Sequence, residues 1–146
     1  MIYIIIIILG LVLDRLTKVY AIHNFIENPI STPIINLTYL ENRGAAFGIL
    51  QDKRLFFLVI TVAIVFYLLY YFYKSHKTNP MILNIGFAMI ISGALGNFYD
   101  RFINGFVVDF IEFSFFSFPV FNVADIFVSL GCAIMIIYII FIHEDK

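Results

Sequence analysis

The run of nineteen uncharged residues at 55–73 is the feature that most constrains how this chain can fold. As an α-helix it would reach about 28 Å, close to the thickness of a bilayer core. Similar apolar stretches lie at 2–13, 80–99 and 119–142. The 146 residues are 62% hydrophobic and 13% charged, against about 25% charged in soluble domains. We therefore expect an all-α membrane protein of one domain, 1–146, built as a four-transmembrane-helix bundle.

The first apolar stretch is too short to cross a membrane, because twelve helical residues reach only about 18 Å. We expect this span to cover about 2–22, which places Asp14 and Lys18 within the membrane on one helical face. An end near Leu13 with solvated charges is the alternative. Lys74 and Lys77 predict a cytoplasmic loop at 74–79. Both termini are then cytoplasmic, and the loops 23–54 and 100–118 lie outside.

The two outer loops contain strand patterns. Residues 34–40 and 106–113 are rich in β-branched and apolar side chains. Asn104-Gly105, just before the second of these segments, is typical of a type I′ hairpin turn. We expect a small extracytoplasmic β-structure. In ENRGAAFGIL, 41–50, Gly44 and Gly48 permit a close backbone approach and Asn42 is expected to point inward. An ordered loop without a functional role is the other interpretation.

Polar residues gather at one end of the predicted bundle. Three spans contribute side chains that the topology places at the outer end: Asp14, Lys18, Asn97, Arg101, Asn122 and Asp125. The outer loops add Asn42 and Asp109. Intramembrane polar groups pair or face a wet cavity, so we expect one site that opens outward. The alternatives are that 92–96 is a helix-packing patch and that Asp100 and Arg101 form a solvated cap.

Two carboxylates offer the simplest chemistry for this site. The sequence has no HExxH motif and its three histidines are scattered, so we do not expect a metal site. Two close carboxylates share a proton and can act as acid and base, which suits Asp109 with Asp125. We place Asp125 about six residues inside the fourth span. A Ser–Lys dyad of Lys18 with Ser92 or Ser129 remains conceivable, although both serines lie deeper.

Five segments in order resemble the lipoprotein signal peptidase (signal peptidase II) family of bacterial intramembrane aspartyl peptidases: DRLTK at 14–18, NRGAAFG at 42–48, SGALGNFYDR at 92–101, VVDF at 107–110 and FNVAD at 121–125. The resemblance implies that Asp109 and Asp125 are catalytic. It implies lining or supporting roles for Asn97, Arg101, Asn122, Asn42, Gly44, Asp14, Lys18 and Asp100. Arg15 stands where the family more often has glutamine, and Ser92 where it more often has glycine.

The resemblance also implies a substrate and a location. The family cleaves diacylglyceryl-modified prolipoproteins just before the lipidated cysteine, in the bacterial cytoplasmic membrane. It needs no cofactor and is blocked by globomycin-type peptides. A net charge of −1 gives no reason to expect nucleic acid as a partner, whereas membrane lipids are expected. A proton-coupled transporter is the main alternative, but its polar relay should continue across the membrane. An assembly subunit would not need such a polar cluster.

Overall fold

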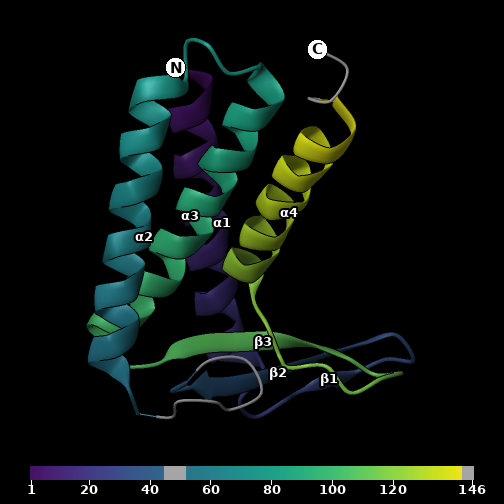
Figure 1. Ribbon diagram of the computed structural model, residues 1–146. Helices are drawn as coiled ribbons and strands as arrows, with labels where there is room; N and C mark the ends of the chain where they lie inside the picture. Colours follow the sequence, from purple (N-terminus) through teal and green to yellow (C-terminus); the bar gives the residue numbers. More distant parts are fainter. Residues whose placement is uncertain (45–51, 143–146) are drawn as a thin grey trace.

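The computed structural model describes residues 1–44 and 52–142, in which four helices stand on a small sheet (Figure 1). The helices are α1 (Ile2–Asn24), α2 (Arg54–Ser75), α3 (Met81–Ile103) and α4 (Val123–Ile137), and a π-helical turn (Tyr138–Ile142) extends α4. The strands β1 (Ile30–Ser31), β2 (Ile35–Asn42) and β3 (Val107–Phe113) form an antiparallel sheet in that order. The sheet lies at the end of the bundle opposite Met1, and both predicted strand segments are confirmed.

Helix α3 is the centre of the bundle, because it packs against α1, α2 and α4. Small residues permit this close packing. A side chain at Gly93 would overlap the Ala124 carbonyl oxygen of α4, and a Cβ at Gly131 would lie 2.7 Å from the Gly86 carbonyl oxygen. The predicted packing patch in 92–96 is therefore a real contact surface, and it holds α4 close to α3.

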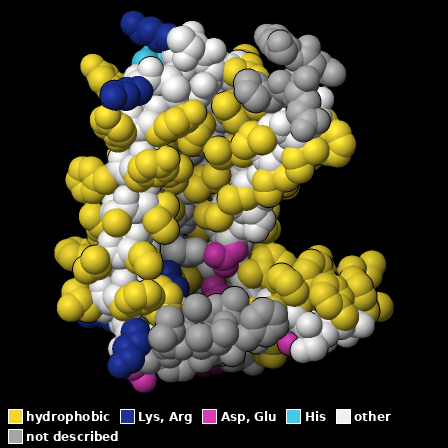
Figure 2. Space-filling model, viewed as in Figure 1, with side chains coloured by type: hydrophobic (Ala, Val, Ile, Leu, Met, Phe, Trp, Pro, Cys, Tyr) yellow, Lys and Arg dark blue, Asp and Glu magenta, His cyan; other side chains and the backbone are white. Residues whose placement is uncertain are grey.

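The outer surface of the helices is apolar, as Figure 2 shows on one face. Within the described residues, three helices are long and apolar enough to cross a membrane: Arg54–Ser75, Met81–Ile103 and Val123–Phe141. α1 has 23 residues, enough length for a span, but every membrane-length window of it includes Asp14, Arg15 and Lys18. The structure thus gives a mostly helical membrane protein with a three-stranded sheet.

Two predicted boundaries are wrong. α3 continues through Asp100 and Arg101 to Ile103, four residues beyond the expected end. Asn104 then caps the helix and Gly105 follows with φ +86°, so this pair terminates a helix instead of turning a hairpin. The fourth helix begins at Val123 and not at 119, because residues just before it form an isolated bridge to β3, in which Phe121 pairs with Ile111.

One buried polar residue lies at the end of the bundle opposite the sheet. Asn84 on α3 is completely buried near the end opposite the sheet. Its amide donates to the His76 carbonyl oxygen at 2.8 Å and to the Tyr3 hydroxyl at 3.4 Å. These bonds tie the start of α3 to the end of α2 and to α1. Asn84 is therefore a structural polar contact at the end opposite the sheet.

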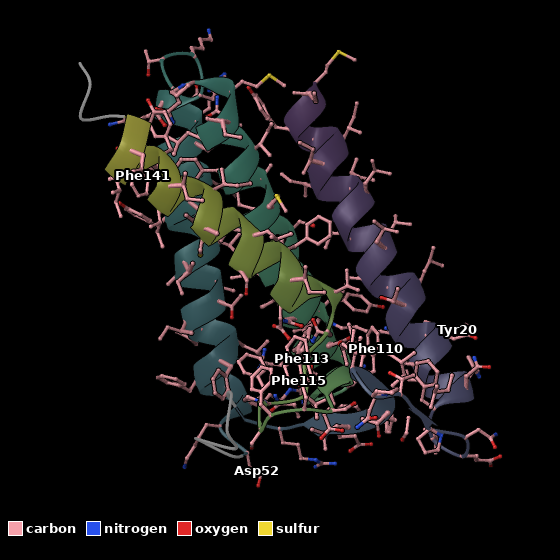
Figure 3. The ribbon with its side chains drawn as sticks, turned by 90° about the vertical axis from the view of Figure 1, so that its right-hand side faces the viewer. Tyr20, Asp52, Phe110, Phe113, Phe115 and Phe141 are labelled. Atoms are coloured by element: carbon pink, nitrogen blue, oxygen red, sulfur yellow. The ribbon has the colours of Figure 1, made fainter. Side chains whose placement is uncertain are left out.

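Aromatic rings join the sheet to the helices (Figure 3). Phe110 on β3 is 6% exposed and packs with Ala21 and Phe25 at the end of α1. Phe113 contacts the Phe121 ring just before α4, with centroids 5.3 Å apart. The sheet is thereby anchored beneath both helices and holds β3 next to the start of α4.

Gly93→Ala should destabilise the protein by about 1–3 kcal/mol, because overpacking a close helix contact forces the backbone to shift. We expect a lower thermal unfolding temperature in detergent. Ala133→Leu is the control, since Ala133 is exposed on α4, the partner helix of this contact, and the unfolding temperature of that variant should not change. An unchanged temperature for Gly93→Ala would contradict the close α3–α4 contact.

Candidate active site

Asp109 reaches the site because of the alternation along β3. Successive strand residues point to opposite faces of a sheet, and the face with Val107, Asp109 and Phe113 lines a cavity, while Phe110 packs into the core on the other face. The Asp109 carboxyl is almost fully buried, with 2% of the residue exposed. Its Oδ2 accepts a hydrogen bond from the Asn42 amide at 2.8 Å. Asn42 comes from the end of β2, the neighbouring strand.

Asp125 lies in the first turn of α4 as part of a capping box. The Asn122 side chain accepts the Asp125 backbone N–H at 3.0 Å, and Asp125 Oδ2 accepts the Asn122 backbone N–H at 3.1 Å. This reciprocal pair satisfies N–H groups that a helix start leaves free. The expectation that Asp125 lies about six residues inside the helix is therefore wrong. Asp125 lies at the N-terminus of α4, where the helix dipole favours a negative charge.

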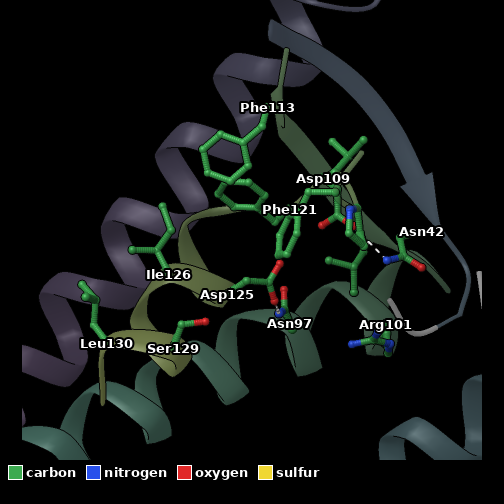
Figure 4. Close-up of a pocket in the computed structure, with 14 residues that line it drawn as sticks. Asn42, Asn97, Arg101, Asp109, Phe113, Phe121, Asp125, Ile126, Ser129 and Leu130 are labelled. Carbon is green, nitrogen blue, oxygen red and sulfur yellow. Dashed lines mark hydrogen bonds between the residues drawn. The ribbon is translucent and has the colours of Figure 1, made fainter. Parts of the chain in front are cut away.

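Asn122 connects the two carboxyl groups. Its amide nitrogen donates to Asp109 Oδ1 at 2.6 Å and to the Asn97 side-chain oxygen Oδ1 at 3.1 Å. Asn97, in turn, donates to Asp125 Oδ1 at 2.7 Å. Figure 4 shows both aspartates reaching into one pocket, Asp109 from β3 and Asp125 from α4. The two carboxyl groups are thus held in a single amide network.

The pocket has a volume of about 490 Å³ and lies between the sheet and the helices, where Figure 2 shows acidic side chains at the back of a hollow. Its polar lining consists of Asn42, Asn97, Arg101, Asp109, Asp125 and Ser129. Its apolar wall consists of Val107, Phe113, Phe118, Pro119, Val120, Phe121, Ile126 and Leu130. A pocket with a carboxylate pair on one wall and an aromatic and aliphatic surface on the other suits a substrate that is largely apolar.

Burial raises the pKa of Asp109 to about 7, and the negative charge of nearby Asp125 adds to the effect. The two amide donors Asn42 and Asn122 act in the opposite direction, because they favour the ionised form. A carboxyl group with a pKa near neutrality can hold a proton and give it up in a reaction. This matches the behaviour expected of one member of a carboxylate pair.

Arg101 lines the pocket from the last turn of α3. Its guanidinium donates to the Gly44 carbonyl oxygen at 2.9 Å and lies over the Phe57 ring, 4.7 Å from the centroid. Gly44 also donates its N–H to Asn42 Oδ1 at 3.0 Å. Arg101 and Asn42 therefore hold the chain at Gly44 against the pocket. Gly48, also expected to permit a close approach, lies outside the described residues.

Lys18, Asp14 and Asp100 lie behind the pocket and do not line it. The Lys18 ammonium, which is completely buried, contacts Asp14 Oδ2 at 2.9 Å, Asp100 Oδ2 at 3.0 Å and the Asn97 side-chain oxygen Oδ1 at 3.0 Å. The predicted pairing of Asp14 with Lys18 is confirmed. Asp100 is 1% exposed, so it is not a solvated cap.

The contacts of Lys18 and Ser92 do not support the Ser–Lys alternative. A lysine ammonium has three donors, and those of Lys18 face two carboxylates and an amide oxygen. The Ser92 hydroxyl donates to the Ile7 carbonyl oxygen at 3.1 Å. In residues 1–44 and 52–142, no group of three or more histidine, cysteine or acidic side chains could hold a metal.

Two features of the site were not predicted. The Arg54 side chain donates to the Arg101 and Phe102 carbonyl oxygens at 2.8 and 2.6 Å, and so caps the end of α3. Nothing in the sequence marked this arginine. The capping box had a signal, since an asparagine three residues before an acidic residue is typical of a helix start.

The apolar helices and the carboxylate-bearing pocket at one end define an integral membrane protein with an enzyme-like site. Residues 6–141 match the family model described as signal peptidase (SPase) II. The lipoprotein signal peptidase of Clostridium tetani (strain Massachusetts / E88) is 47% identical over 143 residues, which is 94% of this chain and 91% of that protein. That of Clostridioides difficile (strain 630) is 42% identical over 149 residues, covering 100% and 99%.

A solved structure has the same fold. A bacterial membrane enzyme solved by the in meso method at 2.3 Å resolution superposes with a TM-score of 0.88 at 33% identity, covering 99% of this chain and 90% of the other. The chain belongs to the signal peptidase II family. It is therefore a peptidase, as the five sequence segments predicted.

The raised pKa of Asp109 predicts a pH-dependent stability. A folded-state pKa of about 7, above the ordinary value of 3.8, adds stability that is complete below pH 3.8 and is lost as the pH rises through 7. Asp109→Asn cannot lose a proton. The variant's unfolding temperature, relative to that of the wild type, should therefore rise between pH 5 and pH 8.

The pH dependence is the informative quantity, because the new amide also faces the donors of Asn42 and Asn122 and costs stability at every pH. Asp52→Asn is the control, since Asp52 is exposed. The difference in unfolding temperature between this variant and the wild type should not change with pH. If the difference in unfolding temperature between Asp109→Asn and the wild type is also independent of pH, the raised pKa of Asp109 is contradicted.

Proposed function

We propose that this protein is an aspartyl endopeptidase that removes the signal peptide from diacylglyceryl-modified prolipoproteins, cutting just before the lipidated cysteine. The observation that carries the proposal is the placement of Asp109 and Asp125 in one pocket, joined through Asn122. Membership of the signal peptidase II family supports the reaction and the substrate class. The apolar wall of the pocket supports a lipid-bearing substrate, and globomycin-type peptides would compete for the same space.

In the proposed mechanism Asp125 is the base and Asp109 the acid. Asp125 accepts two N–H groups at a helix start, a setting that favours the carboxylate. Asp109 has a pKa of about 7 and holds the shared proton at rest. Asp125 removes a proton from a water molecule, which attacks the scissile carbonyl carbon, while Asp109 protonates the carbonyl oxygen. As the tetrahedral intermediate collapses, one of its hydroxyl groups returns a proton to Asp109, and the proton taken up by Asp125 passes to the leaving amine.

The supporting residues have separate tasks in this mechanism. Asn42 and Asn122 hold Asp109, and Asn97 holds Asp125. Arg101 lines the same pocket and keeps Gly44 in place. Asp14, Lys18 and Asp100 support these groups from behind. None of these roles needs a metal or a cofactor.

Asp109→Asn and Asp125→Asn should each abolish cleavage, because each removes a proton acceptor or donor with little change in shape. Cleavage of a diacylglyceryl-modified prolipoprotein would be followed in detergent, with mass spectrometry to locate the cut. Asp52→Asn, which changes an exposed aspartate in the same way, should keep full activity. Substantial activity in either pocket variant would show that its aspartate is not catalytic.

We also propose that α1 is a fourth span in a single 1–146 domain, with both termini in the cytoplasm and the pocket on the extracytoplasmic side. The length of α1 supports a span, since 23 residues reach about 34 Å. Its charges Asp14 and Lys18 are buried against α3 and α4 and do not face lipid. Lys74 and Lys77, between α2 and α3, support a cytoplasmic position for that end.

Cysteine labelling tests this topology. In a Cys132→Ala background, Thr32→Cys, in the turn between β1 and β2, should react with a membrane-impermeant maleimide applied to cells with a permeabilised outer envelope or none. Ile2→Cys and Thr78→Cys should react only after the cytoplasmic membrane is opened. If position 2 reacts together with position 32, α1 does not span the membrane; if position 78 reacts first, the orientation is reversed.

A further inference from the structure

Two carboxylates outside the pocket each bind the backbone immediately before a pocket aspartate. Asp14 Oδ1 accepts the N–H of Ala124, the residue before Asp125, at 3.0 Å. Asp100 Oδ2 accepts the N–H of Val108, the residue before Asp109, at 3.2 Å. The two contacts are equivalent, although Asp14 comes from α1 and Asp100 from α3. Each fixes the backbone from which one pocket aspartate projects.

A single cation joins these two carboxylates. The Lys18 ammonium lies 2.9 Å from Asp14 Oδ2 and 3.0 Å from Asp100 Oδ2. Without that charge the two carboxylates would repel each other, and they are 4% and 1% exposed, so water screens them little. Lys18 therefore holds Asp14, which binds the start of α4, close to Asp100, which binds the start of β3.

We propose that Asp14, Lys18 and Asp100 form a positioning clamp that sets the separation of Asp109 and Asp125. The inference rests on the proposed function of those two aspartates. The clamp residues do not line the pocket that the aspartates share, so they act on the reaction through the backbone, through Asn97 and through the charge of Lys18, which lies close enough to favour the ionised form of Asp109. Carboxyl groups that share one water must be placed closely, since an error of about 1 Å can cost about 100-fold in rate.

The packing around Asp14 is consistent with a fixed geometry. A Cβ at Gly96 would lie 2.6 Å from Asp14 Oδ2 and 3.3 Å from the Ala124 Cβ. Only a glycine at this position leaves Asp14 room between α3 and α4. Gly96→Ala should therefore displace the Asp14 carboxylate without changing any charge. This variant tests the position of Asp14 independently of the ion pairs.

The test compares Asp14→Asn and Asp100→Asn with wild type in the prolipoprotein cleavage assay. Each variant leaves Lys18 one carboxylate partner, so the buried charge stays paired. We expect kcat to fall about 10- to 100-fold while KM stays within about 2-fold, because substrate contacts are intact and only the reacting geometry changes. Gly96→Ala should show the same split between kcat and KM.

Asn84→Ala is the matched control, because it removes a buried polar contact from the same helix at the opposite end. It should lower the unfolding temperature and leave kcat unchanged. The proposal is overturned if the clamp variants keep wild-type kcat, or if their kcat falls only as far as that of Asn84→Ala at an equal loss of unfolding temperature. Asp109→Asn and Asp125→Asn are measured in the same assay to separate failure of the clamp from failure of the proposed function. If these two variants are inactive while the clamp variants keep wild-type kcat, the catalytic role of the two aspartates is supported and the clamp is rejected.

Discussion

The buried ammonium of Lys18 is the interaction on which the rest of this structure depends. A lysine without access to water must be paired where it lies, since an unpaired buried charge costs several kcal/mol. Its two carboxylate partners come from α1 and α3, so the pairing fixes how those helices lie against each other. Asp14 and Asp100 then use their remaining acceptor capacity on backbone N–H groups of α4 and β3. Within the described residues, no buried side-chain nitrogen or oxygen lacks a hydrogen-bond partner. One buried charge thus organises four segments that are distant in the sequence.

Asp125 shows how a carboxylate is tolerated at the edge of an apolar helix. At a helix centre in a bilayer an aspartate costs about 2.5–3.5 kcal/mol on insertion scales. In the first turn it accepts the Asn122 N–H and lies at the positive end of the helix dipole. The same carboxylate therefore caps α4 and lines the pocket. The cap and the hydrogen bond from the Asn97 amide together orient this carboxylate.

Much of this organisation was accessible from the sequence, and the exceptions have physical reasons. The uncharged run within 55–73 and the two β-branched segments predicted α2, β2 and β3 because hydrophobic period and strand propensity are local properties. Residues at the outer ends of different spans were correctly expected to meet, since topology restricts their depth. Asn104-Gly105 was misread because the same dipeptide suits a hairpin and a helix end, and only the tertiary context decides between them. Asn84 was missed since an asparagine in an apolar helix does not reveal its partner, here the His76 carbonyl oxygen.

The depth of the pocket explains how a membrane protein could hydrolyse a peptide bond. Asp125 lies one turn into α4, and Asp109 lies on a strand outside the helices, so the scissile bond of the proposed reaction would sit at the level of the helix ends. Water at that level comes from the aqueous phase, and no channel through the bundle is required. Between Asn84 and the pocket, α3 carries the buried apolar side chains of Phe87 and Ile91, and the buried Ser92 hydroxyl donates to the Ile7 carbonyl oxygen. In residues 1–44 and 52–142 the hydrogen bonds of Asn84 and Ser92 lead away from the pocket and not toward it, and this arrangement favours hydrolysis at one surface over transport across the membrane.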